Sequence, residues 1–205
     1  NVTLTNNADI IFGELSAGTI LSDDDQTGIT IINNAGATIG ITGNNDGTVT
    51  FISATNPTFI NSGTVFSEDG RALSLNRTTG AVFINNAGGV LTAGRSTIRC
   101  VSSCANSTII NSGKIIATSI GLSKAIFFDR SVGSIITNNA GGEITGITGI
   151  VITLNDSDTF TNSGLIRALD DDGKLVLSDT AAVILFDGTN TTVLLKDEGI
   201  VVGTI

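Results

Sequence analysis

Phe83-Ile84-Asn85-Asn86-Ala87-Gly88-Gly89 is one of seven stretches in which an apolar segment ends in an asparagine corner. Three corners read Asn-Asn-Ala-Gly, three read Asn-Ser-Gly, and the first reads Asn-Asn-Ala-Asp. Successive lead asparagines are separated by 27, 28, 24, 26, 27 and 24 residues: Asn6, Asn33, Asn61, Asn85, Asn111, Asn138 and Asn162. A repeat of this length indicates a solenoid, in which each repeat forms one coil.

Before each corner, the expected orientation of the side chains alternates between inward and outward with a period of two, which is typical of a strand. The large apolar residue two positions before each lead asparagine is expected to face the core: Leu4, Ile31, Phe59, Phe83, Ile109, Ile136 and Phe160. The lead asparagine then also lies on the inner side. Coils stacked at about 4.8 Å, the spacing of paired strands, are expected to bring these amides into a ladder. We expect asparagine to adopt the left-handed backbone of the corner, and glycine to stand where a Cβ has no space.

A second strand is expected after each corner, with Ile39, Val65, Leu91, Ile115, Ile144 or Ile166 as its inward residue. Third strands are expected at residues 48–53, 71–76, 95–100, 124–129, 149–154 and 174–178. This pattern predicts an all-β fold, a single-stranded right-handed parallel β-helix (solenoid) of about eight coils with three strands each. One domain is expected over residues 1–205. Because the chain lacks methionine and its last segment reads as an uncapped strand, we expect it to be a fragment of a longer mature protein.

Composition limits the chemistry available to the chain. The formal net charge is −9, and histidine, tryptophan and tyrosine are absent. Without histidine a Ser-His-Asp site is excluded, and two cysteines are too few for the usual zinc site. Cys100 and Cys104 are expected to form a small disulfide loop that stabilises its corner by about 2 kcal/mol, with a redox pair as the alternative. No catalytic residue, metal or cofactor is expected.

Acidic residues offer two weaker candidates. The runs Asp23 to Asp25 and Asp170 to Asp172 contain oxygen ligands suited to Ca²⁺, but lack the spacing of a calcium loop, so charged solubilising loops are favoured. Asp156 and Asp158 are a conceivable hydrolytic pair, for which a solvated turn is the favoured interpretation.

Three phrases carry a resemblance to a known family. They are Thr-Phe-Ile-Asn-Ser-Gly-Thr-Val (58–65), Ile-Thr-Asn-Asn-Ala-Gly-Gly-Glu-Ile (136–144) and Thr-Phe-Thr-Asn-Ser-Gly-Leu-Ile (159–166). Across most of the chain they resemble passenger domains of bacterial autotransporters (type V secretion). The resemblance implies a secreted or cell-surface β-helix that a downstream barrel carries through the outer membrane. That family includes adhesins, self-associating proteins, toxins, proteases, esterases and released passengers that stimulate host receptors, the angiogenic kind among them.

Basic residues are concentrated in the middle of the chain. Residues 1–70 contain eight acids and no Lys or Arg, residues 71–130 contain seven basic residues and one acid, and the remainder contains three basic residues and ten acids. The seven are expected to form a basic face: Arg71, Arg77, Arg95, Arg99, Lys114, Lys124 and Arg130. Stacking is expected to align Arg71, Arg95 and Lys124 in one column. Arg77, Arg99 and Arg130 are expected to form another.

A basic face on an acidic rod suits a sulfated glycan or an acidic host-receptor surface. The alternative is that these side chains shield loops and pair with acids. Nucleic acid is not expected as a partner, because the net charge is strongly negative and aromatic residues do not interleave with the basic ones.

An outward aliphatic stripe is the second candidate surface: Ile32, Ile60, Ile84 and Ile110. It can dock another copy or a partner, or it can be the ordinary composition of an exposed strand. We therefore predict a non-enzymatic passenger that adheres to host cells or matrix. The alternatives are a released receptor ligand, self-association, and a polysaccharide-cleaving β-helix.

Overall fold

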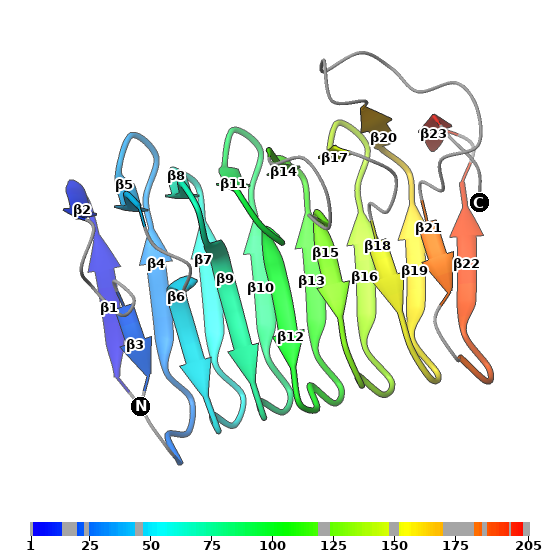
Figure 1. Ribbon diagram of the computed structural model, residues 1–205, viewed down its shortest axis with the longest axis horizontal. Coiled ribbons are helices and arrows are strands. Elements are labelled where there is room, and N and C mark those ends of the chain that lie inside the picture. Colours follow the sequence, from blue (N-terminus) through cyan, green and yellow to red (C-terminus); the bar gives the residue numbers. More distant parts are fainter. Residues whose placement is uncertain are drawn as a thin grey trace.

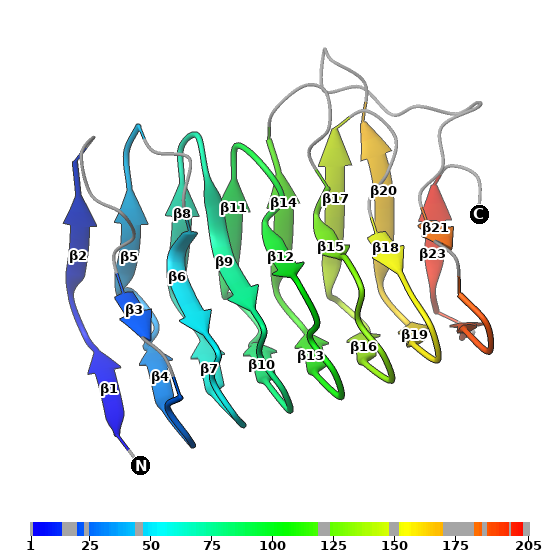
Figure 2. The ribbon, with the colours of Figure 1, turned by 60° about the horizontal axis from the view of Figure 1, so that its bottom comes forward.

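The computed structural model describes residues 2–13, 20–22, 25–43, 47–118, 124–147, 152–169, 183–185, 188–196 and 198–202. In this part of the chain the secondary structure is entirely β, and every strand pairing is parallel (Figures 1 and 2). Three sheets run along a rod, with β1 at one end and β22 at the other. The predicted all-β parallel β-helix is therefore confirmed.

The first sheet, called sheet A, has eight strands: β1 (Thr3–Asn6), β4 (Thr30–Asn33), β7 (Thr58–Asn61), β10 (Val82–Asn85), β13 (Thr108–Asn111), β16 (Ile135–Asn138), β19 (Thr159–Asn162) and β22 (Thr192–Leu195). Sheet B also has eight: β2 (Asp9–Phe12), β5 (Thr38–Ile41), β8 (Thr64–Ser67), β11 (Val90–Ala93), β14 (Lys114–Ala117), β17 (Glu143–Ile147), β20 (Leu165–Leu169) and β23 (Ile200–Val202).

Sheet C has seven strands: β3 (Ile20–Ser22), β6 (Gly47–Ile52), β9 (Arg71–Asn76), β12 (Ile98–Val101), β15 (Ile126–Phe128), β18 (Ile152–Leu154) and β21 (Val183–Leu185). The described strands thus complete seven coils and two sides of an eighth, slightly fewer full coils than expected. Of the predicted third strands, 71–76 agrees with β9. The segment 174–178 lies outside the described residues, and β21 supplies the seventh strand of sheet C.

Two predicted third strands begin too early. β12 starts at Ile98 rather than Arg95, and β15 starts at Ile126 rather than Lys124. The chain still turns between sheets B and C at Thr97, whose side-chain Oγ1 donates to the carbonyl of Ile116. The residues ahead of each strand therefore belong to the corner.

The core is a set of apolar columns along the rod axis. The predicted inward residues of sheet A are 0–2% exposed from Ile31 to Phe160, whereas Leu4 is 39% exposed because its coil is the first. The predicted inward residues of sheet B are equally buried. Phe83 packs against Phe51 and Phe59, with ring centroids 6.2 and 6.5 Å apart. Period-two alternation therefore determines which side chains enter the core.

The asparagine ladder is present along seven coils. Each side-chain Nδ2 donates to the Oδ1 of the next lead asparagine at 2.8–2.9 Å, from Asn6 to Asn162. All seven are at most 4% exposed. However, none of them adopts a left-handed backbone, so that expectation was wrong. Each still belongs to its sheet A strand, and in the Asn-Asn-Ala-Gly corners the left-handed residue is the glycine, at Gly36, Gly88 and Gly141.

The two corner types contact each other between coils. In an Asn-Asn-Ala-Gly corner, the second asparagine donates to the serine of the preceding Asn-Ser-Gly corner: Asn86 to Ser62 at 2.9 Å and Asn139 to Ser112 at 3.0 Å. The glycine of an Asn-Ser-Gly corner lies under the preceding coil. A Cβ on Gly113 would lie 2.2 Å from the carbonyl oxygen of Gly89, so only glycine fits there.

A third set of corners, between sheets C and A, was not anticipated. Two residues before each strand of sheet A from β4 onward stands a residue with positive φ: Gly28, Asn56, Gly80, Asn106, Gly133, Ser157 and Asn190. Backbone hydrogen bonds join these positions from coil to coil. The sequence signal was available, because left-handed backbone favours Gly and Asn.

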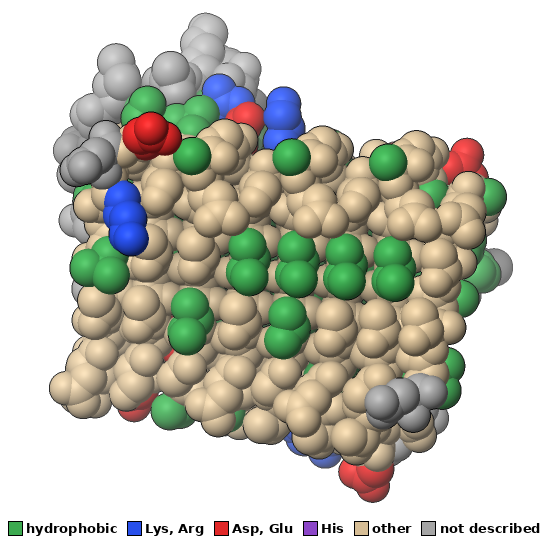
Figure 3. Space-filling model, turned by 180° about the vertical axis from the view of Figure 1, so that it is seen from behind, with side chains coloured by type: hydrophobic (Ala, Val, Ile, Leu, Met, Phe, Trp, Pro, Cys, Tyr) green, Lys and Arg blue, Asp and Glu red, His purple; other side chains and the backbone are tan. Residues whose placement is uncertain are grey.

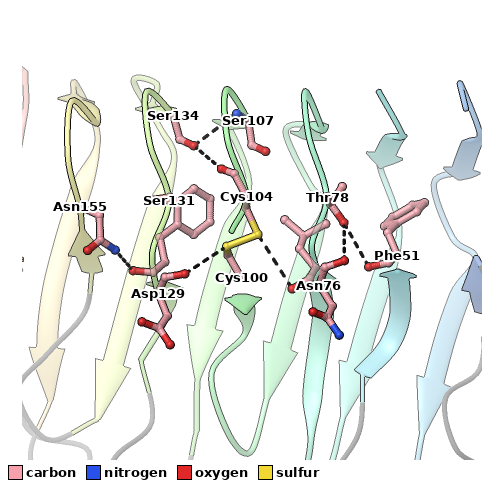
Figure 4. Close-up of a disulfide and its surroundings, with 12 residues drawn as sticks. Phe51, Asn76, Thr78, Cys100, Cys104, Ser107, Asp129, Ser131, Ser134 and Asn155 are labelled. Carbon is pink, nitrogen blue, oxygen red and sulfur yellow. Dashed lines mark hydrogen bonds between the residues drawn. A yellow bond between two sulfur atoms is a disulfide. The ribbon is translucent and has the colours of Figure 1, made fainter. Parts of the chain in front are cut away.

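The disulfide lies in one of these corners (Figure 4). Arg77 and Ser102 occupy equivalent left-handed positions, and so do Gly80 and Asn106. The Cys100–Cys104 coil therefore holds one more residue in its corner than the preceding coil. The predicted disulfide bridges this insertion, and both cysteines are fully buried.

Candidate binding surfaces

The predicted basic columns are only partly formed. Extending the registers of β9, β12 and β15 toward their N-terminal ends aligns Arg71, Ser96 and Lys124 in one row. Arg95 lies one residue outside this row, and its backbone amide donates to the carbonyl of Gly70. The reason is loop length: the Asn-Asn-Ala-Gly corner consumes two extra residues and the following turn from sheet B to sheet C is one residue shorter, so Arg95 falls one residue before the row, in that turn.

The second predicted column is also interrupted. Arg77 and Arg130 occupy equivalent left-handed corner positions with Ser102 between them, while Arg99 lies three residues earlier, within β12. Serine thus separates the cations in both rows, which places them two strand spacings, about 9.6 Å, apart. Wider spacing weakens the repulsion between like charges.

Lys114 does not belong with the others. It lies in β14 of sheet B, 3.8 Å from Glu143, which also pairs with Arg167 on β20. Both partners of Glu143 are therefore engaged on a different side of the rod. For this residue the alternative interpretation, pairing with an acid, describes the structure.

Sequence reasoning overlooked an outward aromatic residue among the basic ones. In β15, Ile126 and Phe128 enter the core, so alternation turns Phe127 outward. The strand register places Phe127 directly beside Arg99 of β12. The Arg99 guanidinium carbon lies 5.8 Å from the ring centroid, and the Lys124 Nζ lies 3.9 Å from it. We call these three residues the Phe127 cluster.

Lys124 is electrostatically perturbed within this cluster. Burial lowers the pKa of its ammonium group, the carboxylate of Asp129 raises that pKa, and the positive charge of Arg99 lowers it. Burial disfavours a charged group unless a counter-charge compensates. The net lowering therefore means that Asp129 offsets only part of the cost of holding a cation here.

The aliphatic stripe is a continuous column. Ile32, Ile60, Ile84 and Ile110 are direct neighbours in the register of sheet A, and all four are half-buried. Figure 3 shows them as a row of four hydrophobic side chains on this face. The sixteen outward positions of the eight strands hold nine threonines, five isoleucines, one valine and one leucine. This face of sheet A therefore carries no charge.

The acidic candidates do not form a catalytic site in the described part of the chain. Asp158 is fully buried and accepts hydrogen bonds from the Ser134 amide, the Asn155 amide and the Ser131 hydroxyl. Asp156 accepts from the amide and hydroxyl of Thr189. The expected solvated turn was wrong for Asp158, whose carboxylate instead joins its own corner to the corner of the preceding coil. Asp23, Asp24 and residues 170–172 lie outside the described residues.

Comparisons with protein-family models, with curated proteins and with solved structures found no match. No group of three or more metal-ligating side chains occurs among the residues that the structure describes. Within the same ranges, no helix is long and apolar enough to cross a membrane.

Proposed function

We propose that this chain is an extracellular binding rod of the autotransporter passenger type, secreted or displayed on the bacterial surface, that adheres to host cells or matrix. The observation that supports adhesion is the concentration of cations on sheet C in an otherwise acidic protein. Arg71 and Arg99 lie in β9 and β12 of that sheet, and Lys124 lies just before β15, so the three come from successive coils. A localised positive field on an acidic rod guides anionic partners to one side of the molecule.

The rod form favours binding over catalysis. Its core columns are apolar and close-packed, and the only buried carboxylate among the described core residues, Asp158, serves as a structural acceptor. The nearest competing role is that of a released passenger that acts as a ligand of a host receptor. A cellular response to soluble protein, without retention on the cells, would favour this alternative. Measurable turnover of a polysaccharide would instead support an enzyme.

The test is binding of the labelled protein to cultured mammalian cells and to immobilised heparin, at low and at physiological salt. We expect retention that decreases with salt and is lost when Arg71, Arg95, Arg99 and Lys124 are all changed to Glu. Charge reversal at Lys114 and Lys196, which lie elsewhere on the rod, is the control and is expected to leave retention nearly unchanged. Absence of wild-type retention at low salt rejects the basic face as the adhesive surface.

Self-association is a second candidate, supported by the uncharged face of sheet A. Two copies of an acidic protein repel least where neither carries charge. From strand spacing and rise, the face measures about 35 by 13 Å, so it covers about 450 Å² per copy, below the roughly 800 Å² typical of a stable complex. We therefore expect only weak pairing. Sedimentation velocity at increasing concentration tests it, with Ile60→Asp and Ile84→Asp expected to abolish any dimer.

A further inference from the structure

The disulfide corner differs from its neighbours in backbone conformation. In the adjacent coils, the first left-handed residue of the corner stands three positions before the second: Ser53 before Asn56, Arg77 before Gly80, and Arg130 before Gly133. In the disulfide coil the separation is four positions, from Ser102 to Asn106, and Ser103 is left-handed as well, with a φ of 79°. Ser103 is therefore the inserted residue, and its conformation has no counterpart in the adjacent corners.

The cross-link is what holds Ser103 in this conformation. A left-handed backbone is disfavoured about tenfold for a residue that has a Cβ. Ser103 is exposed, and within the described part of the chain it makes no hydrogen bond that would compensate. The bond between Cys100 and Cys104 closes the loop in which Ser103 lies, and so restricts the conformations open to it. The oxidised corner thus stores strain that the cross-link maintains.

The surroundings of the two sulfurs also suit the reduced form (Figure 4). The Sγ of Cys100 lies 3.7 Å from the carbonyl oxygen of Asp129 in the next coil, and the Sγ of Cys104 lies 4.0 Å from that of Leu75 in the preceding coil. A disulfide sulfur has no hydrogen to donate, whereas a thiol is a weak donor. A buried thiol otherwise packs as a small apolar group. Reduction would therefore give each sulfur a hydrogen and an acceptor for it in a neighbouring coil.

We propose that the Cys100–Cys104 disulfide is a reversible redox latch for this corner. The thiolate of a dithiol reductant attacks one sulfur and forms a mixed disulfide, which the second thiol of the reductant resolves. Two electrons and two protons pass to the cysteines, their S–S bond breaks, and the reductant becomes a disulfide. Ser103 then leaves its left-handed conformation, while the asparagine ladder bonds of Asn111 keep the coil in place. The latch does not depend on the proposed adhesion.

The experiment measures how readily the disulfide is reduced in the full chain. The protein is equilibrated with mixtures of reduced and oxidised dithiothreitol, quenched with acid, unfolded and alkylated, and the reduced fraction is determined by mass spectrometry. We expect Ser103→Gly to lower the equilibrium constant for reduction about tenfold, because glycine removes the left-handed penalty, which only the oxidised form carries. Ser103→Ala retains a Cβ, so its equilibrium constant should equal that of the wild type.

Ser102→Gly is the matched control on the neighbouring residue. Ser102 occupies the left-handed position that adjacent corners adopt without a disulfide, as at Arg77. Glycine there should stabilise the oxidised and reduced forms alike and leave the equilibrium constant unchanged. Amide hydrogen exchange of the reduced wild type tests whether the change is local. Exchange should become faster in residues 101–107 and stay slow in the ladder strands β10 and β13.

Three results would overturn the inference. If Ser102→Gly and Ser103→Gly change the equilibrium constant equally, the cross-link does not strain the inserted residue. If the reduced protein loses slow exchange in β10 and β13, the disulfide supports the whole rod and is not a local latch. If excess dithiothreitol reduces the wild type only in denaturant, the bond is a permanent part of the fold.

Discussion

Replacing Asn85 with alanine tests whether the ladder holds the coils together. Asn85 Nδ2 donates to Asn111 Oδ1 at 2.8 Å and to the carbonyls of Gly89 and Lys114 at 3.2 Å, and its Oδ1 accepts from Asn61 at 2.9 Å. Each buried polar group left without a partner costs about 1–3 kcal/mol. The backbone carbonyl of Gly89 keeps its ladder bond to the Lys114 amide, so one or two groups are truly orphaned. We expect the free energy of unfolding to fall by about 3 kcal/mol.

Asn86→Ala is the matched control in the same corner. Its side chain lies nearer the surface and donates a single bond, to the Ser62 hydroxyl. Removing it should cost about 1 kcal/mol or less. Guanidinium unfolding followed by far-ultraviolet circular dichroism measures both losses. Equal losses at Asn85 and Asn86 would refute the reasoning, because burial and ladder membership are what distinguish the two asparagines.

The other predictions concern glycine, the disulfide and Lys124. Gly113→Ala should lower the thermal midpoint more than Gly88→Ala, because a Cβ at Gly113 meets backbone at 2.2 Å, whereas at Gly88 only the positive φ opposes it; the reverse order would contradict the close approach. Replacing Cys100 and Cys104 by alanine should lower the free energy of unfolding by about 2 kcal/mol. Reductant should lower the thermal midpoint of the wild type and leave that of the variant unchanged. Lys124→Met should raise the unfolding free energy at neutral pH, since the lowered pKa shows that folding disfavours the charged lysine. Wild-type stability should accordingly rise with pH below pH 10.5, and this rise should be reduced in the variant.

The alkaline experiment is simplified by the composition of the chain. The protein has no tyrosine, and both cysteines are in the disulfide, so lysines are the only side chains expected to titrate in this range. The unfolded chain binds more protons than the folded one between the lowered pKa of Lys124 and its ordinary value of 10.5, which is why stability increases with pH there. A wild-type curve that falls through this window would show that Lys124 is not the destabilising cation.

Much of the fold follows from local sequence because side-chain alternation and coil length are local properties. Phe83 and Leu91 could be assigned to the core by counting from Asn85, and the structure confirms both. Counting failed where loop lengths changed: Arg95 lies one residue outside its expected column because its corner is two residues longer than the one before Arg71, while the turn that follows is one residue shorter.

The candidate site was harder to predict because it depends on exact register between coils. Period two within residues 126–128 already indicates that Phe127 faces outward, but its position beside Arg99 depends on corner lengths in two different coils. Burial of Asp158 depends on one donor from its own corner and two from the corner of the preceding coil, which no single stretch of sequence reveals.

The alternation of corners makes two coils, rather than one, the unit by which such a rod can lengthen. Single coils vary from 24 to 28 residues, yet from Asn33 onward every second lead asparagine follows after 50 to 53 residues. Deleting or duplicating one coil would place two corners of the same type together and disrupt the asparagine-to-serine bonds seen at Asn86 and Asn139. A change of two coils would preserve both the inner ladder and these outer bonds, so we expect growth of this architecture to proceed in paired steps.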